Sequence, residues 1–200
     1  MPVRHIFTVD EWHRMGDAGL FGDSARMELL DGEVIEMSPI GSPHASCVAR
    51  LTLLLISAVG PRALIFPQNP VVLDDYSEPQ PDIAVLAPQR EGYSRVHPSP
   101  AEILLLIEVA DATLAFDRDR KSLAYARAGV RQTWIVDLSG DEVLVMDSPG
   151  PDGYGRVRAV RRGGALEIET LAGVQISADA VLGPNWPITA RTVGPVSEQP

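Results

Sequence analysis

The chain has 200 residues, of which 45% are hydrophobic and 22% charged, values typical of a single globular domain and not of a disordered chain. Its 17 basic and 27 acidic residues give a net charge of −10, which argues against a protein that binds nucleic acid only by neutralising phosphates. An enzyme that acts on nucleic acid is still compatible with this charge, because a bound divalent cation supplies local positive charge. Sixteen of the basic residues are arginine, and the one lysine is Lys121.

Cysteine content and apolar stretches narrow the class of protein further. The single cysteine, Cys47, excludes an intramolecular disulfide and a Cys-rich zinc site. The first residues lack the apolar region of a signal peptide. The longest apolar stretches, 51–59 and 103–107, are shorter than the roughly 20 residues that cross a bilayer. We therefore expect a soluble, cytoplasmic protein with no membrane partner.

The first predicted elements are a helix and a β-hairpin. Thr8 and Glu11 have the spacing of a capping box, which predicts that a helix begins at Thr8. The buried side of this helix is expected to carry Trp12, Met15 and Leu20. The pair Asp31-Gly32 lies between two strand-like runs, so residues 26–37 are predicted to form a hairpin. A second helix is expected to begin with Ser42 as its cap and Pro43 in its first turn, and to end at Gly60.

Most of the remaining chain reads as strands around one further helix. The apolar run 103–110 is typical of a strand that is covered on both faces of a sheet. A helix over 114–128, ending at Gly129, is expected to follow it. The other predicted strands are 64–66, 71–73, 82–87, 133–137, 143–147, 155–160, 165–169 and 173–176, with 88–101 as a loop. This order predicts an α/β or α+β domain over 1–187, with a mixed central sheet flanked by helices, and a flexible tail over 188–200.

Glu108 is the most unusual residue in this pattern. It interrupts the apolar run on the face that strand alternation assigns to Leu104 and Leu106. An ionised carboxylate on a covered sheet face is costly unless a charge or a metal accompanies it. The alternative is that Glu108 lies at the strand end, where it caps a neighbouring helix or pairs with an arginine.

Two other acids lie on predicted strands. Asp82 opens the strand after Pro81, although aspartate is depleted from strands, and its alternative role is that of a turn residue bonded to nearby backbone. Glu28 lies in the first strand of the hairpin, where a solvent-facing glutamate is common. Lys121 lies one helical turn after Asp117 and one before Tyr125, so the three share a stripe. Its alternative role is a solvent-side ion pair with Asp117.

Taken together, these residues indicate a phosphate-hydrolysing site. Two or three carboxylates from adjacent strands can hold Mg²⁺, which prefers oxygen ligands and retains waters. The cation polarises a phosphoryl oxygen and helps to generate hydroxide, while a nearby ammonium positions that water or offsets developing charge. We therefore expect Mg²⁺ as the cofactor, with Mn²⁺ as an alternative.

The same residues carry a resemblance to a known group of proteins. Pro81-Asp82, followed by Glu108-Val109-Ala110 in an apolar strand, resembles the PD-(D/E)xK nuclease superfamily, and more closely its bacterial Uma-two family of restriction endonucleases. The similarity runs from about residue 7 to residue 182. Its matching pieces, in chain order, are 28–33, His44 at a helix start, 80–85, 107–109, Asp117 to Lys121 to Tyr125, 129–130 and 134–137.

The resemblance implies a role for each matching residue. The superfamily lysine normally lies two residues after the acid, where this chain has Ala110, and the Uma-two resemblance implies that Lys121 takes its place as the catalytic cation. It further implies Asp82 and Glu108 as metal ligands, the Val109 carbonyl as another ligand, and Glu28 as an acid that acts through water. The accessory residues that it implies are His44, Asp117 and Tyr125. His44, near a helix N-terminus, either orients a phosphate or water or bonds locally.

The resemblance therefore implies a restriction-endonuclease-like fold and Mg²⁺-dependent hydrolysis of DNA, in which water attacks the phosphorus in line. RNA is an alternative substrate, and a homodimer would suit the cutting of two strands. Two rival functions stay open at this point. One is a non-catalytic binding module that retains the nuclease fold. The other is a hydrolase of a smaller phosphate ester, which the net charge of −10 favours.

Overall fold

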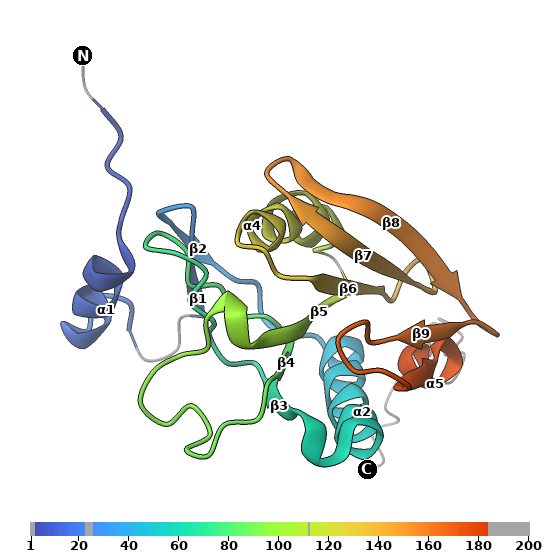
Figure 1. Ribbon diagram of the computed structural model, residues 1–200. Helices are drawn as coiled ribbons and strands as arrows, with labels where there is room; N and C mark the ends of the chain where they lie inside the picture. Colours follow the sequence, from blue (N-terminus) through green and yellow to red (C-terminus); the bar gives the residue numbers. More distant parts are fainter. Residues whose placement is uncertain (1–2, 23–25, 112, 184–200) are drawn as a thin grey trace, which may run out of the picture.

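The computed structural model describes residues 3–22, 26–111 and 113–183. Its central strands are Leu64–Pro67 (β3), Ile83–Leu86 (β4), Ile103–Ala110 (β5), Gln132–Asp137 (β6), Glu142–Gly150 (β7) and Gly153–Arg161 (β8). They form one sheet in the order β3-β4-β5-β6-β7-β8, and only β5 and β6 run parallel. The expected mixed central sheet is thereby confirmed (Figure 1). The tail expected over 188–200 lies outside the described residues.

Helices and two small sheets surround this centre. The helices are Val9–Asp17 (α1), Ser42–Val59 (α2), Leu114–Phe116 (α3), Ser122–Arg127 (α4) and Ala178–Leu182 (α5), with 3₁₀ turns at Gly60–Arg62 and Pro100–Glu102. A π-helical turn, Asp117–Lys121, joins α3 to α4. Two antiparallel pairs complete the fold: Met27–Leu30 (β1) with Glu33–Glu36 (β2), and Ala165–Glu167 (β9) with Gln175–Ser177 (β10).

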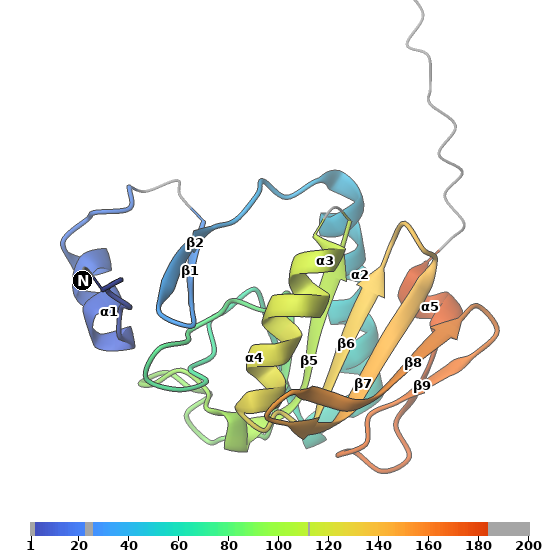
Figure 2. The same cartoon turned by 90° about the horizontal axis from the view of Figure 1, so that it is seen from above.

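The central sheet is covered on both faces, as the apolar run 103–110 predicts. Alternate residues of β5 face opposite sides: Ile107 and Val109 belong to the core cluster that contains α2, and Leu106 belongs to the cluster that contains α4. Figure 2 shows α2 and α4 on opposite sides of the sheet. Glu108 has the same parity as Leu106, so its side chain lies on the α4 face.

The N-terminal helix and the hairpin form where the sequence predicts them. Thr8 caps α1 and forms the full capping box with Glu11. Asp31 and Gly32 both have positive φ, 51° and 74°, as the tight turn between β1 and β2 requires. The expectation of a buried Leu20 is wrong, because its side chain is 66% exposed and no residue of α1 is fully buried. Instead, the Trp12 ring packs on Phe21 with centroids 4.6 Å apart.

Helix α2 begins slightly differently from the prediction. Ser42 is its first residue and Gly41 is the N-cap, which makes no side-chain capping bond. By length and composition alone, Ser42–Arg62 is apolar enough to cross a membrane, a test that the core helix of a globular protein also passes. Its buried residues, among them Leu51 and Leu55, pack in the main core cluster against the sheet.

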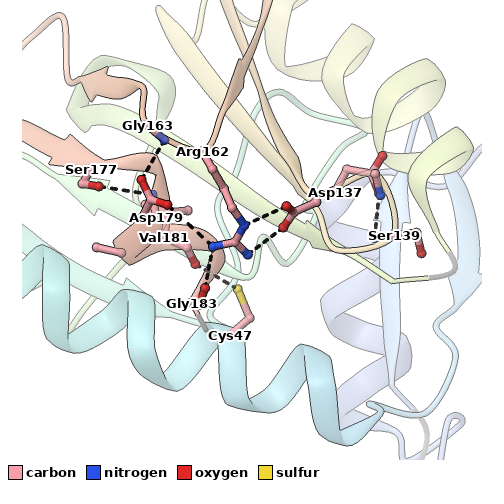
Figure 3. Close-up of polar contacts among 12 residues, drawn as sticks. Cys47, Asp137, Ser139, Arg162, Gly163, Ser177, Asp179, Val181 and Gly183 are labelled. Carbon is pink, nitrogen blue, oxygen red and sulfur yellow. Dashed lines mark hydrogen bonds and ion pairs between the residues drawn. The ribbon is translucent and has the colours of Figure 1, made fainter. Parts of the chain in front are cut away.

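Two further differences from the sequence prediction concern residues 71–73 and the helix α5. Residues 71–73 form no strand, and their backbone bonds the loops instead, as in Val72 N to Pro98 O at 2.9 Å. The short helix α5 has no counterpart in the prediction. Arg162 donates a bond of 2.7 Å to the Gly183 carbonyl at the end of α5 (Figure 3). The same guanidinium donates two bonds of 2.7 Å to the Asp141 carboxylate. Contacts between distant residues therefore hold this helix.

The two faces of α2 lead to a stability prediction. Leu55 is fully buried and Leu53 is 71% exposed, although both lie near the middle of the same helix. We expect Leu55→Ala to lower the free energy of unfolding by about 2–5 kcal/mol, through lost burial and a cavity. Leu53→Ala should change it by no more than about 0.5 kcal/mol. Urea unfolding followed by circular dichroism measures both, and equal losses would contradict the packing of α2.

Candidate active site

A buried cluster of charged residues lies on the α4 face of the sheet, around Glu108 in β5. One oxygen of the Glu108 carboxylate, Oε1, lies 2.9 Å from Lys121 Nζ and accepts a hydrogen bond of 2.5 Å from the Tyr125 hydroxyl. All three residues are almost completely buried. The structure therefore shows Glu108 accompanied by the charge of a lysine, and the described residues do not show the alternative pair with an arginine.

Lys121 ends the π-helical turn and points into the protein. Its side chain is 1% exposed, so it is not the solvent-side partner of Asp117 that one interpretation expected. Besides Glu108, its ammonium lies 3.3 Å from Glu28 Oε2 and donates to the Gln80 carbonyl at 3.3 Å. Asp117, Lys121 and Tyr125 are all buried, and the turn that carries the first two is π-helical, a turn that is frequent at functional sites.

Glu28 reaches the cluster because the hairpin is bonded to the segment before β4. Leu29 exchanges backbone hydrogen bonds with Glu78, at 2.8 and 3.4 Å. The Gln80 N–H then donates to Glu28 Oε2 at 3.1 Å, the same oxygen that faces Lys121. The other oxygen, Oε1, is buried and has no hydrogen-bond partner among the described residues. Glu28 therefore does not lie on the solvent face of its strand.

Asp82 lies just before β4, beside Glu108 and Val109. We refer to the place where Asp82, Glu108 and the Val109 carbonyl meet as the opening of the site. Asp82 Oδ2 accepts from the Val109 N–H at 2.8 Å and lies 3.0 Å from His44 Nε2. The antiparallel register pairs Ile83 with Ile107, and continuing it by one residue places Asp82 opposite Glu108. Opposite residues of an antiparallel pair project from the same face, so the two carboxylates are neighbours.

The donor set at this opening fits a divalent cation. Neither Asp82 Oδ1 nor Glu108 Oε2 accepts a hydrogen bond from the described residues, and the two side chains are 11% and 3% exposed. The Val109 carbonyl points to the same side of β5 as the Val109 N–H, toward Asp82. Two carboxylate oxygens and a carbonyl, completed by water, are the ligands that Mg²⁺ prefers.

Glu28 does not complete a three-acid ligand set. Within residues 3–22, 26–111 and 113–183, no three His, Cys, Asp or Glu side chains are arranged to hold one metal ion. The structure instead divides the predicted acids into two roles. Both oxygens of Glu28 are buried, one of them facing Lys121, while Asp82 and Glu108 each keep one oxygen that accepts no hydrogen bond from the described residues.

Burial and the excess of acids perturb the titration of the cluster. Burial raises the pKa of Glu108 to about 8, which Lys121 opposes and the negative charges of Asp117 and Asp82 reinforce. Burial by itself lowers the pKa of Lys121, but Glu108 and Glu28 outweigh it and hold the pKa above its usual value, so Lys121 stays charged. The pKa of Tyr125 is also raised, chiefly by burial, which keeps its hydroxyl a donor.

The remaining polar groups frame the site. Asp117 accepts a bond of 2.6 Å from Thr113 Oγ1, and burial raises its pKa against the opposing effect of Lys121. The sequence analysis missed two contributions, the Thr113 hydroxyl and the backbone of Gln80. Only the adjacency of Gln80 to Pro81-Asp82 pointed to the latter, and nothing in the sequence singled out Thr113.

Comparison with known proteins identifies a family and a shared fold. Residues 9–179 match the family model Uma2, described as "Putative restriction endonuclease". Among solved structures, a protein from Anabaena variabilis ATCC 29413, described as a putative nuclease belonging to DUF820, superposes with a TM-score of 0.69. That similarity covers 90% of this chain and 98% of the other at 16% identity, a level that shows a shared fold. No curated protein matches the chain.

The raised pKa of Glu108 leads to a pH-dependent stability. Between its ordinary 4.5 and about 8, the folded protein holds a proton on Glu108 that the unfolded chain has released, so stability falls as pH rises through this range. Glu108→Gln removes this contribution, and we expect its melting temperature in EDTA to rise relative to wild type from pH 4.5 to 8. The exposed Glu169→Gln is the control. A constant difference between Glu108→Gln and wild type across the range would show that Glu108 is ionised throughout.

Proposed function

Because the chain belongs to the Uma2 family, whose description is that of restriction endonucleases, we propose that it is a Mg²⁺-dependent endonuclease that hydrolyses DNA phosphodiester bonds. The observation that carries this proposal is the pair of open carboxylate oxygens, from Asp82 and Glu108, beside the buried Lys121 ammonium. Mn²⁺ is the alternative cation and RNA the alternative substrate. We further propose a homodimer, since two sites are needed to cut two strands.

In this proposal Asp82 and Glu108 hold the cation through their free oxygens, and the Val109 carbonyl is a further ligand. When bound, the cation polarises the phosphoryl oxygen and lowers the pKa of the attacking water. Hydrolysis forms a bond from the water oxygen to phosphorus as the bond to the neighbouring nucleotide oxygen breaks. The attacking water loses a proton, and the leaving oxygen takes one up, so that one product end carries the phosphate and the other a hydroxyl group.

The protein's own contribution is positioning and fixed charge. Lys121 holds one oxygen of Glu108, so that the other is presented to the opening. Tyr125 donates to that same held oxygen and limits rotation of the carboxylate. Glu28 keeps Lys121 protonated in a site that water does not reach. Charges that are fixed before the substrate arrives need no reorganisation during the reaction.

Several of the arginines that could attract a phosphate are already paired with acidic side chains. Arg118, Arg120, Arg156, Arg161 and Arg162 each lie within 4.0 Å of an acidic side chain. An arginine that is already paired offers a phosphate less net attraction. The cation therefore supplies the main attraction for phosphate in this proposal, in keeping with the net charge of −10.

The direct test is cation-dependent cleavage of supercoiled plasmid, single-stranded DNA and RNA. We expect nicking or linearisation of DNA with Mg²⁺ or Mn²⁺ and none with EDTA. Asp82→Ala should lower the rate by about 10²-fold or more, because it removes one of the two carboxylates that hold the cation. Gel electrophoresis at fixed enzyme concentration measures the rate.

The matched control is Asp152→Ala, at an exposed turn between β7 and β8, which should cleave like wild type. Equal cleavage by wild type and Asp82→Ala would attribute the activity to a contaminant. Cleavage of no nucleic acid, with hydrolysis of a small phosphate ester, would favour the second rival function. Binding of DNA without hydrolysis of either substrate would favour the binding module.

Lys121 gives a second, independent test. Lys121→Arg keeps the charge, but the larger planar guanidinium does not fit a fully buried site built around a compact ammonium. We expect cleavage to fall by about 10-fold or more, with a lower melting temperature. Arg120→Lys, the exchange of one basic residue for another at the adjacent, partly exposed position, should leave both unchanged. Full activity of Lys121→Arg would show that only the charge is required there.

A further inference from the structure

Among the described residues, His44 is the histidine that contacts a carboxylate of the proposed cation site. It lies in the first turn of α2, and its side chain is 15% exposed. Its Nε2 lies 3.0 Å from Asp82 Oδ2, across a separation of 38 residues in sequence. This contact excludes purely local hydrogen bonding as the role of His44.

Asp82 Oδ2 therefore has two hydrogen-bond partners, and Oδ1 has none among the described residues. The partners of Oδ2 are the backbone N–H of Val109 in β5, at 2.8 Å, and the His44 ring in α2. Because a carboxylate oxygen accepts, the hydrogen of the second bond lies on Nε2, which assigns the ring tautomer. The other ring nitrogen, Nδ1, is buried without a partner in the described part of the chain.

Two hydrogen bonds to Oδ2 restrict the rotation of the Asp82 carboxylate more than one hydrogen bond does. The terminal torsion of aspartate is broad and nearly two-fold, so the Val109 bond by itself lets the carboxylate plane turn about Oδ2. A second donor, from an element outside the sheet, fixes that plane. The oxygen left free, Oδ1, is then held toward the opening that it shares with Glu108.

From this geometry we propose that His44 is a positioning residue, which orients Asp82 so that Oδ1 faces the divalent cation. The inference rests on the proposed function, and it assigns His44 an effect on cation affinity and not a contact with the substrate. Hydrogen bonds from outside the ligand set orient metal ligands in this way, and their loss typically weakens metal binding by about 10- to 100-fold.

The fold gives His44 a rigid support. The residues that follow it, Cys47, Val48 and Leu51, are buried in the main core against the sheet. The start of α2 is therefore fixed relative to β5, the strand that carries Val109 and Glu108. A ring placed on such a helix holds its partner more precisely than one placed on a loop.

The experiment compares two variants of His44 in the full chain. His44→Phe removes the donor but keeps a ring, and His44→Gln keeps an N–H donor on a flexible side chain. Calorimetric titration of EDTA-stripped protein with Mn²⁺ measures affinity independently of activity. We expect a Kd about 10- to 100-fold weaker for His44→Phe, and recovery of most of that loss in His44→Gln. Activity of His44→Phe should be restored by a higher Mn²⁺ concentration.

The matched control is Ser46→Ala, at an exposed position of the same helix, which should bind Mn²⁺ like wild type. Melting temperatures in EDTA establish that each variant is folded, and His44→Gln carries the test if His44→Phe does not fold. If a folded His44→Phe binds Mn²⁺ with the Kd of wild type, the proposed role of His44 is wrong, and the proposed function is unaffected. If the wild type neither binds Mn²⁺ nor cleaves, both this inference and the proposed function fail. Mn²⁺ binding without cleavage overturns only the nuclease proposal.

Discussion

The burial of Lys121 is the constraint on which the rest of the site depends. An ammonium removed from water is stable only if nearby charges replace its hydration, and here Glu108, Glu28 and the Gln80 carbonyl do so. Those three partners come from β5, from the hairpin and from the loop before β4. The lysine therefore adds polar contacts between parts of the chain that also meet in one apolar cluster, which includes Leu30, Val71 and Leu106.

The same cluster carries more negative charge than one lysine can neutralise. Glu108, Glu28 and Asp117 all act on a single ammonium, and burial, reinforced by the negative charges of Asp117 and Asp82, raises the pKa of Glu108. A divalent cation bound between Asp82 and Glu108 would relieve this imbalance, because it would add positive charge beside the two carboxylates. The acidic composition that argues against simple phosphate binding is thus consistent with a site that recruits its positive charge from solution.

Much of the architecture follows from local chemistry and was predictable. The capping box at Thr8, the Asp31-Gly32 turn and the apolar run 103–110 each give rise to the element that they predict, because short-range sterics and burial decide them. The predictions that were wrong concern features that depend on contacts between distant segments. Residues 71–73 have a strand-like composition but find loop partners, and Leu20 is apolar but meets no core. Helix α5 is bonded by Arg50 and Arg162, which both lie outside it.

The sequence by itself determined which residues are chemically out of place: an acid in a buried strand, an aspartate at a strand start and one lysine among sixteen arginines. It also carried a family resemblance, which the match over residues 9–179 confirms. Only the tertiary structure decided which oxygen of each acid is held and which is free. That choice depends on donors from distant segments, Val109, His44, Lys121 and Tyr125, and strand periodicity specifies the face of a side chain but not its partners.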